Sequence, residues 1–151
     1  MRQLIYSMHF TGTASSSGED RKMLRMLSSG ASCQWETRVT SAGLEARVQP
    51  AEGDLAFLES EVHLKTPDSF EGQGTLSFGE EGEHSLRFRT MEAGHFAPSQ
   101  IPGVMAGAAS WRIEGGSGRF AAAAGFITST FTLSESGEWN EYHCGLIFVR
   151  D

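Results

Sequence analysis

The stretch that decides the fold is WRIEGGSGRFAAAAGFITSTF, residues 111–131. Two runs of strand-forming residues flank a connection in which Gly116 and Gly118 permit the backbone angles of a tight turn. The spacing of Gly116, Gly118 and Ala121 also matches the GxGxxA form of a dinucleotide-binding fingerprint, which requires a following helix. Because strand-like residues resume at Phe126, there is no room for that helix. The stretch therefore predicts two strands joined by a structural glycine turn.

The same pattern of short strand runs and glycine-containing turns extends along the whole chain. Glycine accounts for 18 of the 151 residues and falls between alternating or apolar runs rich in Thr, Val, Ile and Phe. Most connections are too short for a parallel crossover, so successive strands should pair antiparallel. We expect strands at about 2–13, 32–40, 43–49, 54–65, 70–79, 84–91, 107–114, 125–133 and 139–149.

Closure of the first strand against the last would remove the two unpaired edges of such a meander. We therefore predict a single all-β domain over 1–151, an antiparallel up-and-down barrel of eight strands, or nine, with one short helix. The last strand is largely apolar on both faces, which would leave one face for the interior and one for a homo-oligomer contact, most simply a dimer. These faces are Tyr142, Cys144, Leu146 and Phe148 on one side, and His143, Gly145, Ile147 and Val149 on the other.

One segment departs from the strand pattern. Ser17 to Asp20 has the Ser-x-x-acid form of a capping box, and apolar residues follow at helical spacing, namely Met23, Leu24, Met26 and Leu27. We expect a short amphipathic helix at about 18–28. It would serve either as a plug over the barrel core or as a Met-rich lid on the mouth of a ligand site.

Composition excludes several classes of function. The net charge is −7 and the twelve Lys and Arg residues are scattered, which argues against nucleic acid and anionic membranes as partners. The chain lacks a signal-peptide run and an apolar stretch of membrane-spanning length, so we expect a cytoplasmic protein. Cys33 and Cys144 lie far apart without CxxC spacing, so we expect two free thiols, no metal and no cofactor.

The run Trp-x-Ile-x-Gly-Gly-Ser-Gly-Arg-Phe, followed by small residues, Gly125 and a Thr/Ser/Phe strand, resembles the signature of the allene oxide cyclase-like barrels. That family includes plant allene oxide cyclases, dirigent proteins and small bacterial barrel cyclases. The resemblance covers about 107–133 and implies an eight-stranded, usually oligomeric barrel around a hydrophobic cavity. It also implies guided cyclisation or coupling of lipophilic intermediates. It carries over no catalytic residue.

The segment 92–106 is the longest candidate connection after the predicted helix, and its apolar residues should fold over one barrel end. We expect the functional mouth beside it, with His95 and Arg89 as catalytic candidates, because histidine is suited to proton transfer near neutrality. Large side chains should form the walls of the binding site. The expected substrate-binding residues are Trp111, Tyr142, Phe88, Phe96 and Met105.

These observations leave three hypotheses for function. The first is a cofactor-independent cyclase or isomerase that folds a hydrophobic small molecule of natural-product type into a reactive shape. The second is a non-catalytic carrier or sensor that holds one hydrophobic ligand, as lipocalins do. The third is a structural barrel filled by its own side chains, which an interior without a void of roughly 300 Å³ would favour.

Overall fold

The computed structural model describes residues 1–19 and 21–150, and almost all of its regular structure is antiparallel β-sheet. Two short 3₁₀ turns, η1 (Glu80–Gly82) and η2 (Gly118–Phe120), lie between strands. The strands are β1 (Arg2–Ser17), β2 (Met23–Thr40), β3 (Gly43–Pro50), β4 (Ala56–Thr66), β5 (Ser69–Phe78), β6 (His84–Thr90), β7 (Gly94–Pro98), β8 (Val104–Ser117), β9 (Ala124–Ser134) and β10 (Glu138–Val149).

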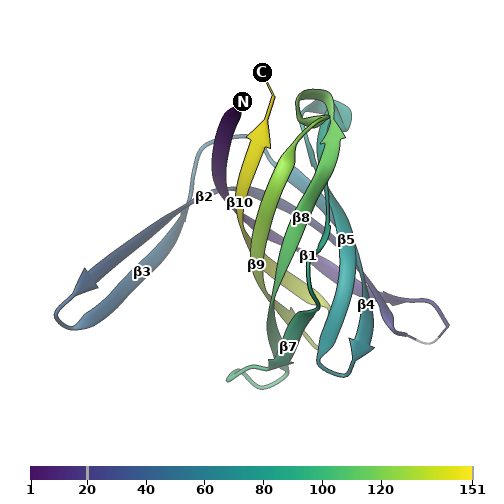
Figure 1. The fold of residues 1–151 in the computed structure, drawn as a ribbon. Coiled ribbons are helices and arrows are strands. Elements are labelled where there is room, and N and C mark those ends of the chain that lie inside the picture. The colour runs from purple at the N-terminus through teal and green to yellow at the C-terminus, as the bar shows by residue number, and fades with distance from the viewer. Residues whose placement is uncertain (20, 151) are drawn as a thin grey trace.

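The strands close into a ring in the order β1-β10-β9-β8-β6-β5-β4-β2, and β1 pairs with β2 to complete it (Figure 1). β7 continues the position of β6, because both strands pair with β5 and with β8. Neighbours in the ring are neighbours in the sequence, apart from β3, which pairs only with β2 and stands outside the ring. The predicted eight-stranded, up-and-down antiparallel barrel is confirmed.

Period-2 alternation separates the barrel interior from its outer wall. Along β9 and β10 every second residue is buried, and β4 shows the same alternation over most of its length. The inward side chains form one continuous core through the ring. Its largest completely buried members are Phe10, Met26, Leu58, Leu76, Leu86, Ile127 and His143.

The short helix predicted at 18–28 is wrong. Ser17 pairs with Met23 in a β1–β2 hairpin, where Gly18 and Arg21 have φ of 86° and 54°. Asp20, the acidic member of the predicted capping box, lies outside the described residues. From Met23 on, the chain pairs with β1 on one side and β4 on the other, so hydrogen bonding in the closed sheet overrides the helical spacing of the apolar residues.

The glycine turn of 111–131 has the predicted structural role. Gly118 has a φ of 55°, and a Cβ on it would lie 2.3 Å from His84 Nδ1 and 2.6 Å from the Glu83 carbonyl oxygen. A Cβ on Gly116 would lie 1.8 Å from the Ser85 carbonyl oxygen. These glycines let β8 and the turn approach the β5–β6 connection, and no nucleotide-binding helix follows them.

The predicted 92–106 connection is mostly strand. β7 and the start of β8 take up most of it and leave only two short turns. The paired strands extend the barrel wall on both sides of the Ser99–Gly103 turn, where the backbone N–H of Ser99 donates to the carbonyl oxygen of Val104. The segment therefore forms one end of the barrel, at the bottom of Figure 1, and does not fold across it as a loop.

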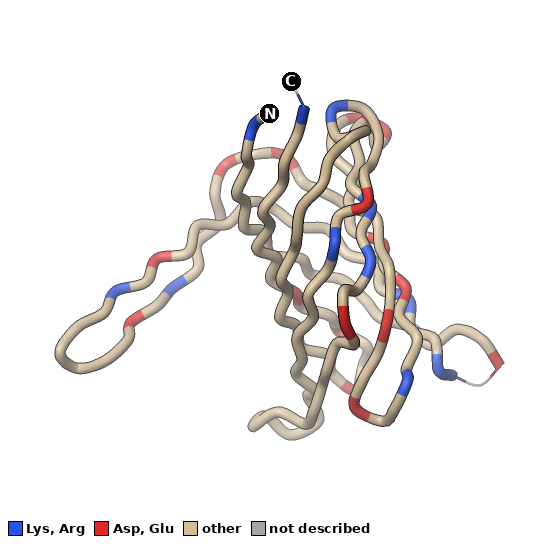
Figure 2. Tube along the Cα trace, in the orientation of Figure 1, with Lys and Arg blue, Asp and Glu red and all other residues tan. Residues whose placement is uncertain are grey.

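Charged side chains lie on the outer wall, the turns and the β2–β3 hairpin (Figure 2). Of the described Asp, Glu, Lys, Arg and His residues, Glu141 and His143 depart from this pattern, because both are buried in the barrel interior. None of the described helices is long and apolar enough to span a membrane.

Candidate functional site

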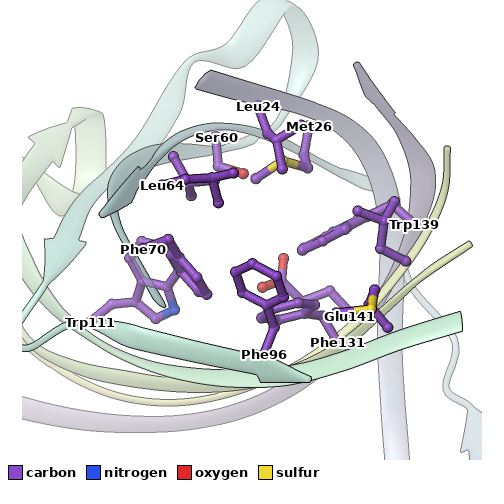
Figure 3. Close-up of a pocket in the computed structure, with 13 residues that line it drawn as sticks. Leu24, Met26, Ser60, Leu64, Phe70, Phe96, Trp111, Phe131, Trp139 and Glu141 are labelled. Atoms are coloured by element: carbon purple, nitrogen blue, oxygen red, sulfur yellow. The ribbon is translucent and has the colours of Figure 1, made fainter. Parts of the chain in front are cut away.

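An apolar cavity lies inside the barrel, at the end formed by the β4–β5, β7–β8 and β9–β10 turns (Figure 3). Its volume is about 60 Å³. Several of the side chains that line it near this end of the barrel are only partly buried. The cavity is lined by Leu24, Met26, Ser60, Val62, Leu64, Phe70, Phe96, Met105, Trp111, Phe131, Leu133, Trp139 and Glu141.

Aromatic rings give the cavity rigid walls. Phe131 stacks on Trp139 with a centroid separation of 4.6 Å, and its ring meets Phe70 edge-on at 5.7 Å. The indole N–H of Trp111 donates to Ser129 Oγ at 2.9 Å, and this buried hydrogen bond holds the ring orientation. These contacts tie three strands, β5, β8 and β9, to the wall at β10.

Glu141 is the one ionisable side chain among the thirteen described residues that line the cavity. Figure 3 shows its carboxylate among the rings of Phe96, Phe131 and Trp139. Alternation along β10 turns it inward with Trp139 and His143, and only 3% of the side chain is exposed. A carboxylate in such surroundings loses most of its hydration, so it is held there at a cost in stability.

His143 lies behind Glu141, deeper in the barrel. Its Nε2 is 3.3 Å from Glu141 Oε1, and 1% of its side chain is exposed. The rings of Phe10 and Phe88 meet the imidazole edge-to-face at centroid distances of 5.0 and 6.0 Å. Neither ring nitrogen has hydrogen-bond geometry to any described group, so the contact with Glu141 is one of proximity.

Tyr6 completes the polar interior on the neighbouring strand β1. Its ring packs against Gly145, where a Cβ would lie 1.9 Å from Tyr6 Cε1, so this glycine makes the space for the ring. The phenol oxygen is fully buried and has no hydrogen-bond partner among the described groups. Burial raises the pKa of the Tyr6 phenol far above its usual value, and the charges of Glu141 and Cys144 raise it further.

Several buried polar atoms inside the barrel are left without a hydrogen bond. Each such atom costs about 1–3 kcal/mol, and a folded protein contains few of them. Two of the residues concerned, Tyr6 and His143, interact electrostatically with or lie beside Glu141, so the barrel interior around this carboxylate is the candidate site. The atoms are Tyr6 Oη, Ser28 Oγ, Trp139 Nε1 and both ring nitrogens of His143.

Three of the residues expected to bind substrate, Trp111, Phe96 and Met105, line this cavity. Phe88 is buried next to it, with its ring 5.2 Å from Trp111, but does not belong to the lining. The mouth expected beside 92–106 thus coincides with the end of the barrel that holds the cavity.

The structure does not bring the other predicted site residues to the cavity. Tyr142 faces outward on β10, because the alternation that turns Glu141 inward turns its neighbour out, and its ring stacks on His9 at 4.3 Å. His95 is exposed on β7 for the same reason, opposite in direction to Phe96. Arg89 is exposed on β6, with its Nε 3.8 Å from Glu114 Oε2 on the outer wall.

The sequence analysis did not predict Glu141 as a site residue, and it assigned His143 to one face of the last strand without a functional role. The signal was available: on the face of β10 that carries Trp139, Ile147 and Val149, Glu141 is the one charged residue. A carboxylate within an apolar inward set has to be buried, which is rare without a function.

The size of the cavity limits what it can hold. A water molecule needs roughly 10–15 Å³ by this measure, so about 60 Å³ admits a group of a few heavy atoms. This is far below the roughly 300 Å³ at which pockets for drug-sized ligands begin. A whole lipophilic intermediate therefore does not fit into the cavity. The cavity has room only for the reactive end of such a molecule.

No group of three or more His, Cys, Asp or Glu side chains with metal-binding geometry occurs in the described part of the chain. Cys33 and Cys144 are both free. Comparison with known proteins finds no matching family model, no matching curated protein and no matching solved structure. The functional assignment therefore depends on the interior of this barrel.

Proposed function

We propose that the protein is a cofactor-independent isomerase or cyclase that takes the reactive end of a lipophilic small molecule into the barrel and moves a proton on it with Glu141. The observation that carries the proposal is the Glu141 carboxylate, the single ionisable group of an apolar cavity, 3.3 Å from a buried histidine. Resemblance to the allene oxide cyclase-like barrels favours the same class of reaction.

The chemistry follows from the placement of the two groups. The Glu141 carboxylate would act as the base that removes a C–H or O–H proton, and the apolar lining would keep water from competing with the substrate for it. His143 Nε2, 3.3 Å from the carboxylate, would take the proton from Glu141 or return it once the two side chains rotate into hydrogen-bond geometry. The rings of Phe96, Phe131 and Trp139 hold an apolar substrate in one shape, which lowers the entropic part of the barrier.

Substrate access requires the partly buried side chains at the barrel end to move. Leu64, Phe96 and Met105 come from three different strands and stand at the mouth, so rotation of a few χ angles would widen it without breaking the sheet. The remainder of a long substrate would then extend through the mouth into solvent.

The second candidate is a carrier or sensor, favoured by the small number of polar groups in the lining. It would use the same cavity, with Glu141 accepting a hydrogen bond from the ligand head group. An enzyme and a carrier differ in whether Glu141 catalyses a reaction of the bound molecule. An inert barrel would differ from both because it would bind no ligand.

Binding is tested with n-alkanols of increasing chain length, titrated against tryptophan fluorescence in a Trp35→Phe background, so that only Trp111 and Trp139 report. Catalysis is tested with 5-nitrobenzisoxazole, an apolar probe of buried bases. The base removes the C3 proton, the C–H electron pair forms the nitrile, the N–O bond breaks, and a coloured phenolate leaves. We expect alkanol affinity to rise with chain length and Glu141→Gln to abolish the protein-catalysed elimination.

Glu135→Gln is the matched control, because Glu135 is an exposed carboxylate in the β9–β10 turn at the same barrel end. It should keep the elimination rate of the wild type. Alkanol binding without Glu141-dependent elimination would identify a carrier. Absence of alkanol binding would show that the barrel is filled and has neither function.

A further inference from the structure

The β2–β3 hairpin projects from the barrel as an arm whose β3 strand is exposed along its whole length. β2 leaves the ring after Ser32, and Cys33–Thr40 pairs with Gly43–Pro50 alone (Figure 1). We call residues 33–50 the arm. Every residue of β3 is exposed, and eight residue pairs at about 3.4 Å each make the arm about 27 Å long.

The two faces of the arm differ sharply in polarity. One face combines residues of β2 and β3 that oppose each other in register, Trp35 with Val48 and Val39 with Leu44. The opposite face carries Glu36, Arg38, Glu45 and Arg47, and Arg47 Nε lies 2.6 Å from Glu36 Oε2. The polar face is thus neutral and suited to water, whereas the apolar face is 83% exposed at Val39 and 71% at Leu44.

The outer wall of the barrel carries an exposed strip that is apolar, like the apolar face of the arm. Ile5 on β1, Leu146 on β10 and Phe126 on β9 are aligned in register across three neighbouring strands. Ile5 is 71% exposed and Phe126 is 46% exposed. Leu27 and Phe57 are also exposed on β2 and β4, but the strip places three apolar side chains in register on neighbouring strands, which offers an apolar face a continuous contact.

At the base of the arm, its apolar face touches the outer wall of its own barrel. Trp35, the first large side chain of the apolar face, meets Tyr142 of the outer wall edge-on at 6.2 Å. Tyr142 belongs to the same outward row of β10 as Leu146. The β2–β3 hairpin projects away from its own barrel (Figure 1), so the far end of the arm does not lie on its own strip.

We propose that the partner of the arm is a second copy of this chain, in a two-fold dimer where each arm lays its apolar face on the Ile5–Leu146–Phe126 strip of the other barrel. A two-fold arrangement satisfies both surfaces of both chains at once, because the same pair of patches is used twice. This contact goes beyond the proposed function and does not depend on the barrel cavity.

The exposed area is sufficient for a stable dimer. The exposed parts of Trp35, Val39, Leu44 and Val48 together with Ile5 and Phe126 amount to roughly 700 Å² a chain, against about 800 Å² a partner in a standard interface. The arm, about 27 Å long, also spans more than the width of the three strands of the strip, at about 4.8 Å between strands.

The test is the mass of the full chain in solution, measured by light scattering and sedimentation at micromolar concentration. We expect twice 16.4 kDa for the wild type. Leu44→Asp on the arm and Phe126→Asp on the strip should each reduce the mass to that of one chain and keep the β-sheet circular dichroism signal.

Two matched controls separate a specific contact from a general loss of apolar surface. Gln34→Asp adds a charge to the polar face of the arm, and Phe57→Asp replaces a ring on β4 that is 59% exposed, more than the 46% of Phe126; both variants should remain dimeric. A wild-type mass of 16.4 kDa would overturn the proposal. So would a dimer that Leu44→Asp dissociates but Phe126→Asp leaves intact, because the arm would then pack on something other than the strip.

Discussion

Nε2 of His143 lies 3.3 Å from Oε1 of Glu141, and both side chains are almost completely withdrawn from solvent. The residues are two apart on β10, so the same alternation that buries one buries the other. Opposite them in register on β1 stand Phe10 and Met8, which offer no hydrogen bond to either. The pair therefore lies in a largely apolar interior, with the Tyr6 phenol as a further polar group that senses the charge of Glu141.

Replacing Glu141 with Met should stabilise the protein. The carboxylate is only 3% exposed and lies among apolar side chains, and Met has a similar length and no charge, so we expect the free energy of unfolding to rise by about 1–3 kcal/mol. Chemical denaturation in urea measures it. A loss of stability of more than about 1 kcal/mol would identify Glu141 as a structural residue and remove the main support for the catalytic site.

Shortening Phe96 should open the cavity. Its ring is half-buried at the barrel mouth, so Phe96→Ala should accelerate alkanol association in stopped-flow fluorescence and lower the free energy of unfolding by about 1–2 kcal/mol. Phe78→Ala is the control, because Phe78 is also half-buried but packs on Phe120 at the opposite barrel end. An equal acceleration in both variants would show that ligands do not enter beside Phe96.

Gly118→Val should destabilise the fold by about 2 kcal/mol or more. Its φ of 55° disfavours a β-branched side chain, and the added Cβ would lie 2.3 Å from His84 Nδ1. The neighbouring Ser117 has an extended φ of −133°, so Ser117→Val should change the melting temperature far less. A Gly118→Val variant with an unchanged melting temperature and weaker alkanol binding would instead make this glycine part of the ligand site.

The buried phenol of Tyr6 should cause the free energy of unfolding to fall as the pH rises into the alkaline range. Burial raises the pKa of its phenol above the usual value near 10, so above that pH the phenol ionises in the unfolded chain and stays neutral in the folded one. Stability should therefore be constant with respect to this group below about pH 10 and fall as the pH rises further. Tyr6→Phe should show a shallower fall in urea denaturation between pH 9 and 11, and equal slopes would place the phenol in contact with water.

Much of the architecture could be predicted from the sequence. The predicted strand runs at 43–49, 84–91 and 125–133 differ from β3, β6 and β9 by one residue at most ends, because alternation and turn glycines act locally. The helix predicted at 18–28 was wrong because the spacing of its apolar residues fits a helix, whereas pairing with β1 and β4 makes the chain from Met23 on a strand. Alternation also left the direction of each face open, so Tyr142, His95 and Arg89 were expected at a cavity that they do not face.

The amino-acid sequence alone was enough to predict an antiparallel meander. Period-2 alternation and turn glycines depend on residues that are close together along the chain, so both can be recognised without the structure. Only the tertiary structure decided that β1 closes on β2 and β10, that Glu141 points inward with His143, and that residues 33–50 leave the barrel. These depend on register between strands far apart in sequence, and a shift of one residue would exchange the interior for the outer wall.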